Sequence, residues 1–332
     1  MEKIGLVAQK RVFTTYSLVK LGKRVQSAAR IAGSDGMNHL SSTGLPDFDT
    51  LWDYNQPAQS EERFRELLPA ARASGDRDYH LQLLTQIARA QGLRRQFEAA
   101  HATLDHVREA MTDELPTVRV RYLLERGRCF NDSGNHERAR ECFLQAWELG
   151  QTERLDGYAV DAAHMMGIIE RPATQAMAWN LRAVEYAKAS NHSDARRWLA
   201  SLQNNIGWTY HAMGQYAEAL AVFEEALRLY QAQGKARQVR IARWSVAKMQ
   251  RLLGRANEAL PVQESLLGEC ERAREPDGYV HEELAECLHG LGRTKAAVAH
   301  FARAYELLSN DPGFPADERA RLQRMKELGK SK

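Results

Sequence analysis

The stretch Asn205–Ala226, which reads NIGWTYHAMGQYAEALAVFEEA, decides the fold class of this chain. Gly207 and Tyr210 lie one turn apart on a first predicted helix, and Gly214 can adopt the positive φ that ends it. Along a second predicted helix, small and aromatic residues recur at steps of four and three, at Ala219, Phe223 and Ala226. Because small residues let two helices approach closely and aromatic rings fill the remaining space, the stretch predicts a helical hairpin.

The same pattern recurs along most of the chain. The alanines that open the predicted second helices are 39, 37, 43, 40 and 38 residues apart, at Ala100, Ala139, Ala176, Ala219, Ala259 and Ala297. Alanine and glycine are common, so one copy would be weak support, but six copies in register are hard to obtain by chance. The sequence therefore predicts six stacked hairpins over residues 81–308, with a period near forty.

The order and spacing of these residues resemble the tetratricopeptide repeat family, whose motif runs W-L-G-Y, then G-Y, then A-F-A-P. The usual repeat of that family has 34 residues and commonly ends in Pro, whereas no such Pro follows Ala146, Ala226 or Ala304. The longer variant is similar to repeats of bacterial signalling sensors and motor light chains. The resemblance implies an all-α fold, a right-handed superhelical solenoid of antiparallel helix hairpins, with a concave surface that suits a peptide or a helix.

Two segments flank the predicted array. Residues 46–80 are expected to form an N-terminal capping half-repeat, and residues 309–332 a C-terminal capping helix and tail. Residues 1–45 carry seven basic and two acidic side chains and run into Gly/Ser-containing stretches typical of a loose linker. We interpret them as a flexible tail. A targeting or membrane-surface helix, and a misassigned start with Met37 as the true one, are the alternatives.

The overall composition excludes several classes of protein. With 332 residues, 44% of them hydrophobic and 27% charged, the chain can bury a core, which excludes intrinsic disorder. The 46 basic and 43 acidic side chains leave a net charge of only +3, so no nucleic acid partner is expected. No apolar run approaches the roughly 20 residues of a membrane-crossing helix, so no integral membrane association is expected. Four cysteines without a C-x-x-C spacing favour a cytoplasmic location.

The sequence carries none of the common signatures of an enzyme or a metal site. H-E-x-x-H, G-x-S-x-G, G-x-G-x-x-G and phosphate-loop patterns are absent. We therefore expect no catalytic residue, no metal ligand and no cofactor. His164 takes the place of a small residue on a predicted first helix, and we interpret it as a hydrogen-bonded, partly buried histidine rather than a catalytic one.

The predicted first helices supply a candidate ligand-binding surface. In the hairpin quoted above, residues at steps of four and three lie opposite the packed Gly207 and Tyr210. This register places the following side chains on the concave face: Thr85, Arg89, Arg128, Asn131, Asn204, Trp208, His211, Trp244, Lys248, Arg251, Glu282 and Glu286. Arginine and tryptophan dominate the binding energy of many interfaces, so we expect a basic and aromatic middle. For Trp208 and Trp244 the alternative is packing between adjacent repeats.

These features favour a non-enzymatic module that binds a protein or peptide partner. The basic face suits an acidic segment or one that bears a C-terminal carboxylate. A bacterial-type sensor or regulator, whose superhelix changes shape on ligand binding, is the alternative. An enzyme hidden on the repeats, around His164, is the least favoured function. The sequence leaves homo-oligomerisation through the terminal repeats open.

Overall fold

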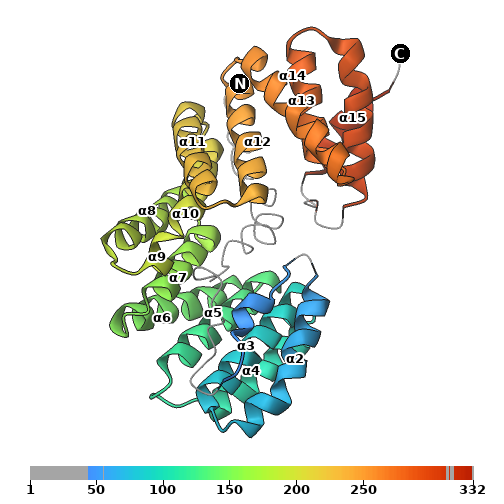
Figure 1. Ribbon diagram of the computed structural model, residues 1–332. Helices are drawn as coiled ribbons and strands as arrows, with labels where there is room; N and C mark the ends of the chain where they lie inside the picture. Colours follow the sequence, from blue (N-terminus) through green and yellow to red (C-terminus); the bar gives the residue numbers. More distant parts are fainter. Residues whose placement is uncertain (1–43, 55, 312–313, 315–317, 331–332) are drawn as a thin grey trace. The chain divides into compact units, whose positions relative to one another are not determined.

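The computed structural model describes residues 44–54, 56–311, 314 and 318–330. Within these ranges every regular element is a helix, and helices that follow one another in the sequence pack together (Figure 1). The expected all-α architecture of stacked helix pairs is confirmed. The tail predicted for residues 1–45 lies outside the described residues, except for its last two positions.

The described residues divide into two compact units, and the division falls within α10 (Leu199–Ala212). The N-terminal unit, up to Leu202, contains the 3-10 helix η4 (Phe48–Leu51) and the helices α2 (Pro57–Ala73), α3 (Arg77–Leu93), α4 (Phe97–Ala110), α5 (Pro116–Asp132), α6 (His136–Thr152), α7 (Asp156–Ile169), α8 (Ala173–Ala189) and α9 (Ser193–Arg196). The C-terminal unit, from Gln203, contains α11 (Tyr216–Ala232), α12 (Ala236–Leu252), α13 (Ala256–Ala273), α14 (Gly278–Gly290), α15 (Thr294–Ser309) and α16 (Arg319–Leu328).

Consecutive helices form hairpins in both units. In the N-terminal unit α3 packs on α4, α5 on α6 and α7 on α8; in the C-terminal unit α12 packs on α13 and α14 on α15. The first hairpin begins at Arg77 rather than at residue 81. The reason is the cap of α3, because the Asp76 carboxylate accepts a hydrogen bond from the backbone N–H of Tyr79 at 2.9 Å.

A contact between a glycine and an aromatic ring holds the best hairpins together. A Cβ atom added to Gly207 would lie 2.7 Å from the Phe223 ring, and one added to Gly127 would lie 2.5 Å from the Phe143 ring. Phe143 and Phe223 are both fully buried. Only glycine therefore lets the first helix approach the ring of the second this closely, which is the reason for the sequence pattern.

The turn between the two helices also favours glycine. Gly134 and Gly214 have φ angles of +91° and +75°, in the left-handed region that other residues adopt only at a cost. Gly214 ends the first helix of its hairpin, as the sequence predicts.

Two hairpins place a polar side chain where the pattern has an aromatic ring. Asn180 on α8 and Gln263 on α13 stand four residues after the alanine that opens the second helix, where Phe143 and Phe223 stand in their hairpins, and both are fully buried. The Asn180 Nδ2 donates to the Ala176 carbonyl at 3.0 Å, but its Oδ1 has no hydrogen-bond partner. Neither amide atom of Gln263 has one. Such orphaned groups weaken a core, so these hairpins hold polar defects.

Helices occupy both flanking segments. Residues 46–80 hold η4, α2 and the start of α3, and α16 lies within residues 309–332. α16 packs on α15 and buries Met325 completely. A Cβ on Gly329 would lie 2.6 Å from the backbone nitrogen of Ala302, so the end of α16 is held closely against α15.

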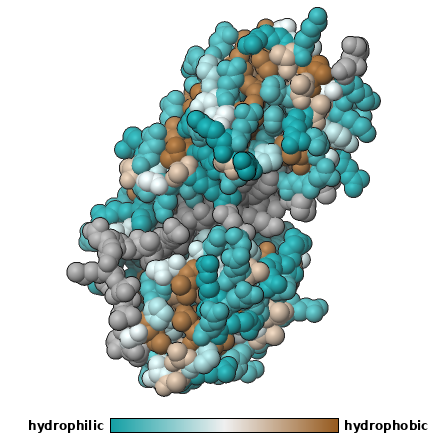
Figure 2. Space-filling model, turned by 45° about the vertical axis from the view of Figure 1, so that its right-hand side comes forward, coloured by the Kyte–Doolittle hydropathy of each residue, from teal (hydrophilic) through white to brown (hydrophobic). Residues whose placement is uncertain are grey.

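The described surface is mainly polar. Figure 2 shows one face on which hydrophilic side chains predominate. Only Leu181 and Met213 are exposed large apolar side chains among the described residues. None of the described helices has both the length and the apolar content needed to span a membrane. All four cysteines are free, and burial raises the pKa of the Cys129 and Cys287 thiols to about 12, as expected of small core residues.

Candidate functional site

On the first helices of the N-terminal unit, the predicted basic residues lie in a buried chain of ion pairs. Arg128 on α5 donates to both Asp161 oxygens, at 2.5 and 2.6 Å, and to Glu125 at 2.6 Å. Arg89 on α3 has its Nη1 atom 3.5 Å from Glu125. None of the four side chains is more than 10% exposed. Two cations therefore face two carboxylates, and this part of the face is electrically balanced.

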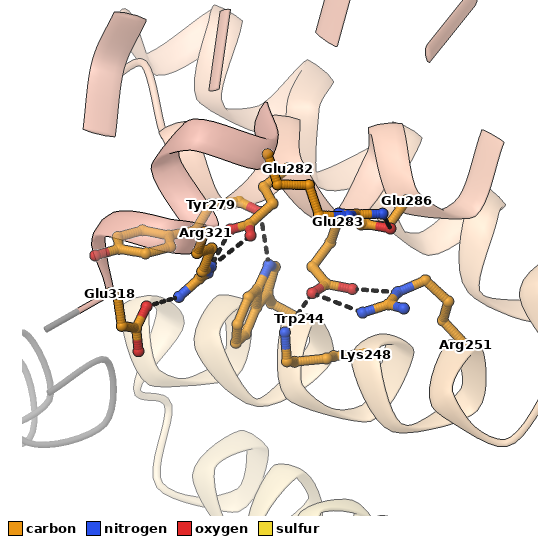
Figure 3. Close-up of polar contacts among 10 residues, drawn as sticks. Trp244, Lys248, Arg251, Tyr279, Glu282, Glu283, Glu286, Glu318 and Arg321 are labelled. Atoms are coloured by element: carbon orange, nitrogen blue, oxygen red, sulfur yellow. Dashed lines mark hydrogen bonds and ion pairs between the residues drawn. The ribbon is translucent and has the colours of Figure 1, made fainter. Parts of the chain in front are cut away.

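The corresponding group in the C-terminal unit is unbalanced. Glu283 on α14 accepts hydrogen bonds from Arg251 Nε at 2.7 Å and Arg251 Nη2 at 3.1 Å, and from the Lys248 ammonium group (Figure 3). The Glu283 side chain is 1% exposed, while those of Lys248 and Arg251 are 14% and 19% exposed. Burial alone would raise the pKa of Glu283, but the two cations lower it to about 2. Within this group of three side chains, two positive charges share one carboxylate, so the group carries one positive charge in excess.

The predicted acidic residues of α14 are paired with the C-terminal helix. Glu282 accepts two hydrogen bonds from Arg321 on α16, one of them 2.5 Å long, and Arg321 also donates to Glu318. Glu286 accepts two from Arg324 on α16, one of them 3.1 Å long. Figure 3 shows Arg321 between Glu282 and Glu318. The capping helix thus pairs both carboxylates, and with Glu318 three carboxylates face the two arginines.

The two predicted tryptophans differ in burial. Trp244 on α12 is 4% exposed, and its Nε1 donates to the carbonyl of Tyr279 on α14 at 3.2 Å. Its place agrees with packing between repeats. Trp208 on α10 is partly buried, with its ring centroid 5.1 Å from Phe223 and 6.0 Å from Trp244. The first-helix face of the C-terminal unit therefore continues from α10 to α12 through two indole rings.

His211 adds a neutral polar group beside Trp208. The centroids of the two rings lie 5.2 Å apart. Burial and the nearby Lys248 lower the pKa of His211 to about 4, so its imidazole is uncharged at neutral pH.

Asn204 lies one helical turn before Trp208. Its side chain is 1% exposed, and neither its Nδ2 nor its Oδ1 has a hydrogen-bond partner. Leaving both ends of a buried amide unpaired costs free energy, and Asn204 shares this state with Gln263 in the core of another hairpin. An amide with a free donor and a free acceptor can pair with both groups of a peptide unit.

The remaining predicted residues lie in the N-terminal unit. Thr85 is fully buried, and its hydroxyl donates to the Gln82 carbonyl at 2.6 Å. Asn131 is partly buried, donates to Asp132 at 3.1 Å and contacts His136. The structure thus places Thr85 in the interior and Asn131 at the end of α5.

Sequence reasoning missed the carboxylates that neutralise the basic residues. Asp161 lies 33 residues after Arg128, and Glu283 lies 35 after Lys248 and 32 after Arg251. These separations are close to one repeat, so opposite charges on successive first helices were a usable signal. The expectation of a basic middle counted only the cations, and it needs this correction.

The described residues offer no group of three or more His, Cys, Asp or Glu side chains that could hold a metal ion. His164 on α7 is 3% exposed and packs its ring 5.2 Å from that of Trp198. Burial lowers the pKa of His164 to about 4. Its surroundings agree with the interpretation as a core histidine.

Comparison with known proteins identifies the repeat. A family model described as tetratricopeptide repeat matches residues 172–232. A search of curated proteins found no match. Among solved structures, the apo form of RapI aligns with a TM-score of 0.62 and 11% identity, over 83% of this chain and 78% of RapI.

Two further solved structures are similar. Aspartyl phosphate phosphatase F from Bacillus subtilis has a TM-score of 0.52 and 12% identity, over 91% of this chain and 82% of that one. NprR in complex with its cognate peptide NprX has a TM-score of 0.51 and 16% identity, over 89% of this chain and 85% of that one. At such low identity these likenesses establish the fold.

Proposed function

Because this chain is a tetratricopeptide repeat protein, we propose that it is a non-enzymatic interaction module that binds a peptide segment of a partner protein. The proposed site is the first-helix face of the C-terminal unit, formed by α10 and α12. The ligand is a segment with a carboxylate, either an acidic side chain or a C-terminus.

The excess positive charge at Glu283 is the observation that carries this proposal. Lys248 and Arg251 share one buried carboxylate, and both keep part of their side chains exposed. The ammonium and guanidinium groups have more donors than Glu283 has acceptor sites for them. A second carboxylate, brought by the ligand, would complete the ion pairing at this point.

Three neighbouring side chains suit the rest of a peptide. Trp208 offers the partly exposed surface of an indole ring and His211 is uncharged, while the buried Asn204 beside them has an unpaired donor and acceptor that a peptide backbone would reach only after neighbouring side chains move. NprR, which has a similar fold, holds its cognate peptide NprX, and that precedent supports a peptide as ligand.

The basic residues of the N-terminal unit take no part in this proposal. Arg89 and Arg128 are buried and balanced by Glu125 and Asp161, so a carboxylate ligand would have to displace carboxylates already in place. We propose that they stabilise the stacking of α3, α5 and α7. A cytoplasmic location, supported by four free cysteines, remains our prediction.

Affinity capture from the native lysate tests the proposal with two variants that preserve the fold. Lys248→Gln removes the excess charge but leaves Glu283 its Arg251 partner. Asn204→Leu removes the unpaired amide at nearly constant size. Each should lower partner recovery about tenfold, whereas Asn204→Leu should not lower the melting temperature.

Arg228→Gln is the matched control, because Arg228 lies on the second helix α11 in an exposed pair with Glu225. It removes the same charge as Lys248→Gln away from the proposed face, so recovery should not change. Equal recovery by wild type, Lys248→Gln and Asn204→Leu would exclude the site.

A peptide panel tests the preference for a carboxylate. Acidic octapeptides with a free C-terminus, the same peptides amidated, and neutral peptides would be compared by fluorescence anisotropy. We expect affinity to fall in that order and the difference to shrink in Lys248→Gln. Equal affinity across the panel would contradict the chemistry proposed for the ligand.

A regulatory role is the second candidate, since RapI and aspartyl phosphate phosphatase F share the fold. A sensor must bind its ligand with different affinity in two shapes. Small-angle scattering with and without a peptide that binds would reveal a change in the radius of gyration. An unchanged profile would leave simple binding as the function.

A further inference from the structure

An acidic and aromatic segment precedes the first long helix. Residues 45–54 read LPDFDTLWDY, with three aspartates and three aromatic residues in ten positions. Only the four residues of η4 are helical within it. The segment nevertheless buries Phe48 and Trp52, which are 6% and 4% exposed, in the core of the N-terminal unit.

One carboxylate of this segment binds a buried arginine on a first helix. The Asp49 carboxylate accepts two hydrogen bonds from Arg121 on α5, from Nη1 at 3.2 Å and from Nη2. Arg121 has a side chain only 8% exposed, and its Nε donates to the Tyr158 hydroxyl on α7 at 2.7 Å. Burial opposes the charge of Arg121, but Asp49 outweighs it and raises the pKa of the guanidinium group.

Aromatic rings enclose this ion pair. The guanidinium carbon of Arg121 lies 5.3 Å from the Phe48 ring centroid and 5.4 Å from that of Tyr158. The Phe48 ring meets Tyr79 on α3 edge-on, with centroids 5.1 Å apart. Cation–π contacts with this geometry strengthen an arginine site once water is excluded.

Further polar contacts tie the segment to α3. The Tyr79 hydroxyl donates to the Pro46 carbonyl at 2.7 Å, and the Trp52 Nε1 donates to the Gln86 side chain at 2.9 Å. Trp52 also meets Phe64 on α2 edge-on, with centroids 4.9 Å apart. The segment is thus recognised by α3, α5 and α7 through one carboxylate, two aromatic side chains and one backbone carbonyl.

We propose that this face of the N-terminal unit is a second peptide-binding site, specific for an acidic and aromatic segment, and that residues 45–54 fill it as a tethered ligand. The contacts are those of a protein–peptide complex, with a bidentate arginine–carboxylate pair at the centre and an indole as anchor. The site uses Arg121, Tyr79 and Gln86 and does not depend on the proposed site in the C-terminal unit.

Tethering determines how such a site behaves. A segment joined to its site by a short linker has an effective concentration of the order of millimolar, so a free peptide of the same kind competes poorly. Weakening the tethered segment should therefore expose the site to a competing peptide.

Binding of the segment's own sequence in trans tests the proposal. The probe is a fluorescein-labelled peptide of residues 44–54, titrated with the full-length chain and followed by fluorescence anisotropy. Asp49→Lys places a cation against Arg121 but keeps Phe48 and Trp52 in the segment. We expect Asp49→Lys to bind the peptide at least about tenfold more tightly than wild type does.

Asp113→Lys is the matched control, since Asp113 makes the same kind of pair with Arg119 but its side chain is 94% exposed. It should bind the peptide as weakly as wild type. If Asp49→Lys loses its helical circular dichroism, Asp49→Asn keeps the shape of the segment and should still improve binding about threefold.

A second peptide tests the chemistry. The same probe with Asn in place of Asp49 should bind Asp49→Lys about tenfold more weakly than the unchanged probe. Equal binding of both probes, or equal binding of the probe by wild type and by a folded Asp49 variant, would overturn the proposal and leave residues 45–54 as part of the core only.

Discussion

The two units carry similar first helices but balance their charges differently. In the N-terminal unit Arg89 and Arg128 face Glu125 and Asp161, so each cation has a carboxylate. In the C-terminal unit Lys248 and Arg251 both form their ion pair with Glu283, and the nearby Glu286 is itself paired with Arg324. Ion pairs between successive first helices therefore occur in both units. In the N-terminal unit they are balanced and stabilise the stacking of the helices, whereas in the C-terminal unit they leave hydrogen-bond donors of Lys248 and Arg251 without a carboxylate.

Buried ion pairs alone are weak evidence of stability or function, because the loss of hydration offsets much of the attraction. What distinguishes the two units is the imbalance. A balanced chain such as Arg89–Glu125–Arg128–Asp161 has little to gain from a new ligand. A ligand carboxylate would complete the ion pairing around Glu283, which is why we propose that the C-terminal unit recognises an acidic segment.

Removing the shared carboxylate should have the largest effect. Glu283→Gln leaves both Lys248 and Arg251 largely buried without a carboxylate. We expect it to lower the free energy of unfolding in urea by about 3–5 kcal/mol. Glu125→Gln should cost less, roughly 1–3 kcal/mol, because Arg128 keeps Asp161 and the pair that Arg89 loses is a long one, at 3.5 Å.

Hydrogen exchange would locate the two losses of stability. We expect faster exchange of the backbone amides of α14 in Glu283→Gln and of α5 in Glu125→Gln. Equal costs for the two substitutions would remove the contrast between the units. A gain in stability for Glu283→Gln would mean that the carboxylate is a net burden, and the proposed surplus would be wrong.

An intermediate effect should come from the polar defects of the hairpin cores. Gln263→Met removes a buried amide with no partner at nearly constant length, and should raise the free energy of unfolding by about 1–3 kcal/mol. Asn180→Leu in the N-terminal unit should gain less, since Nδ2 already donates to Ala176 and Gly167 lies against the amide. Urea denaturation measures both.

Gln231→Met on the exposed side of α11 is the control for Gln263→Met and should change the free energy of unfolding by less than about 0.5 kcal/mol. A loss of stability in Gln263→Met would show that the Gln263 amide is satisfied in solution, for example by a buried water.

The hairpins could be predicted because their determinants are local. Gly207 and Phe223 lie within one repeat, and a missing Cβ opposite a ring is a contact that spacing alone reveals. Gly214 likewise ends its helix through its own backbone. Six alanines at intervals of about forty residues, with these contacts in the clearest copies, left no other fold class.

The charges of the candidate site could be predicted only in part. Lys248 and Arg251 were assigned to the binding face, but register placed Glu282 there rather than its neighbour Glu283, which binds them. One position on a helix is a rotation of about 100°, and the rotation of one first helix against the next is set by packing between repeats. The spacing of residues within one repeat does not reveal this rotation.

The contact of Asp49 with Arg121 was also beyond prediction. The two residues are 72 positions apart, and the segment around Asp49 has no repeat pattern that would place it. Its composition, acidic and aromatic beside a predicted basic face, was the available signal. A search for segments of the chain that complement its own binding face would have found it.

The last effect is a dependence of stability on pH that both units share. Burial lowers the pKa of His164 to about 4, from about 6.5 in an unfolded chain, although Asp161 raises it again in part and Arg128 lowers it. Between these two values the unfolded chain binds a proton that the native His164 does not, so stability falls as the pH falls from about 6.5 to 4. His211, whose pKa is also lowered to about 4, acts with the same sign in the C-terminal unit.

Replacing either histidine with the neutral glutamine isolates its contribution to the pH dependence of stability. Between pH 7 and pH 5, His164→Gln should lose about 1–2 kcal/mol less of its unfolding free energy than wild type does. The paired carboxylate Glu283, with its pKa lowered to about 2, loses its contribution only below about pH 4.5, so it does not disturb this window. The same pH dependence in His164→Gln and wild type would mean that His164 has the same pKa in the native protein as in the unfolded chain, which its burial beside Trp198 and Arg128 argues against.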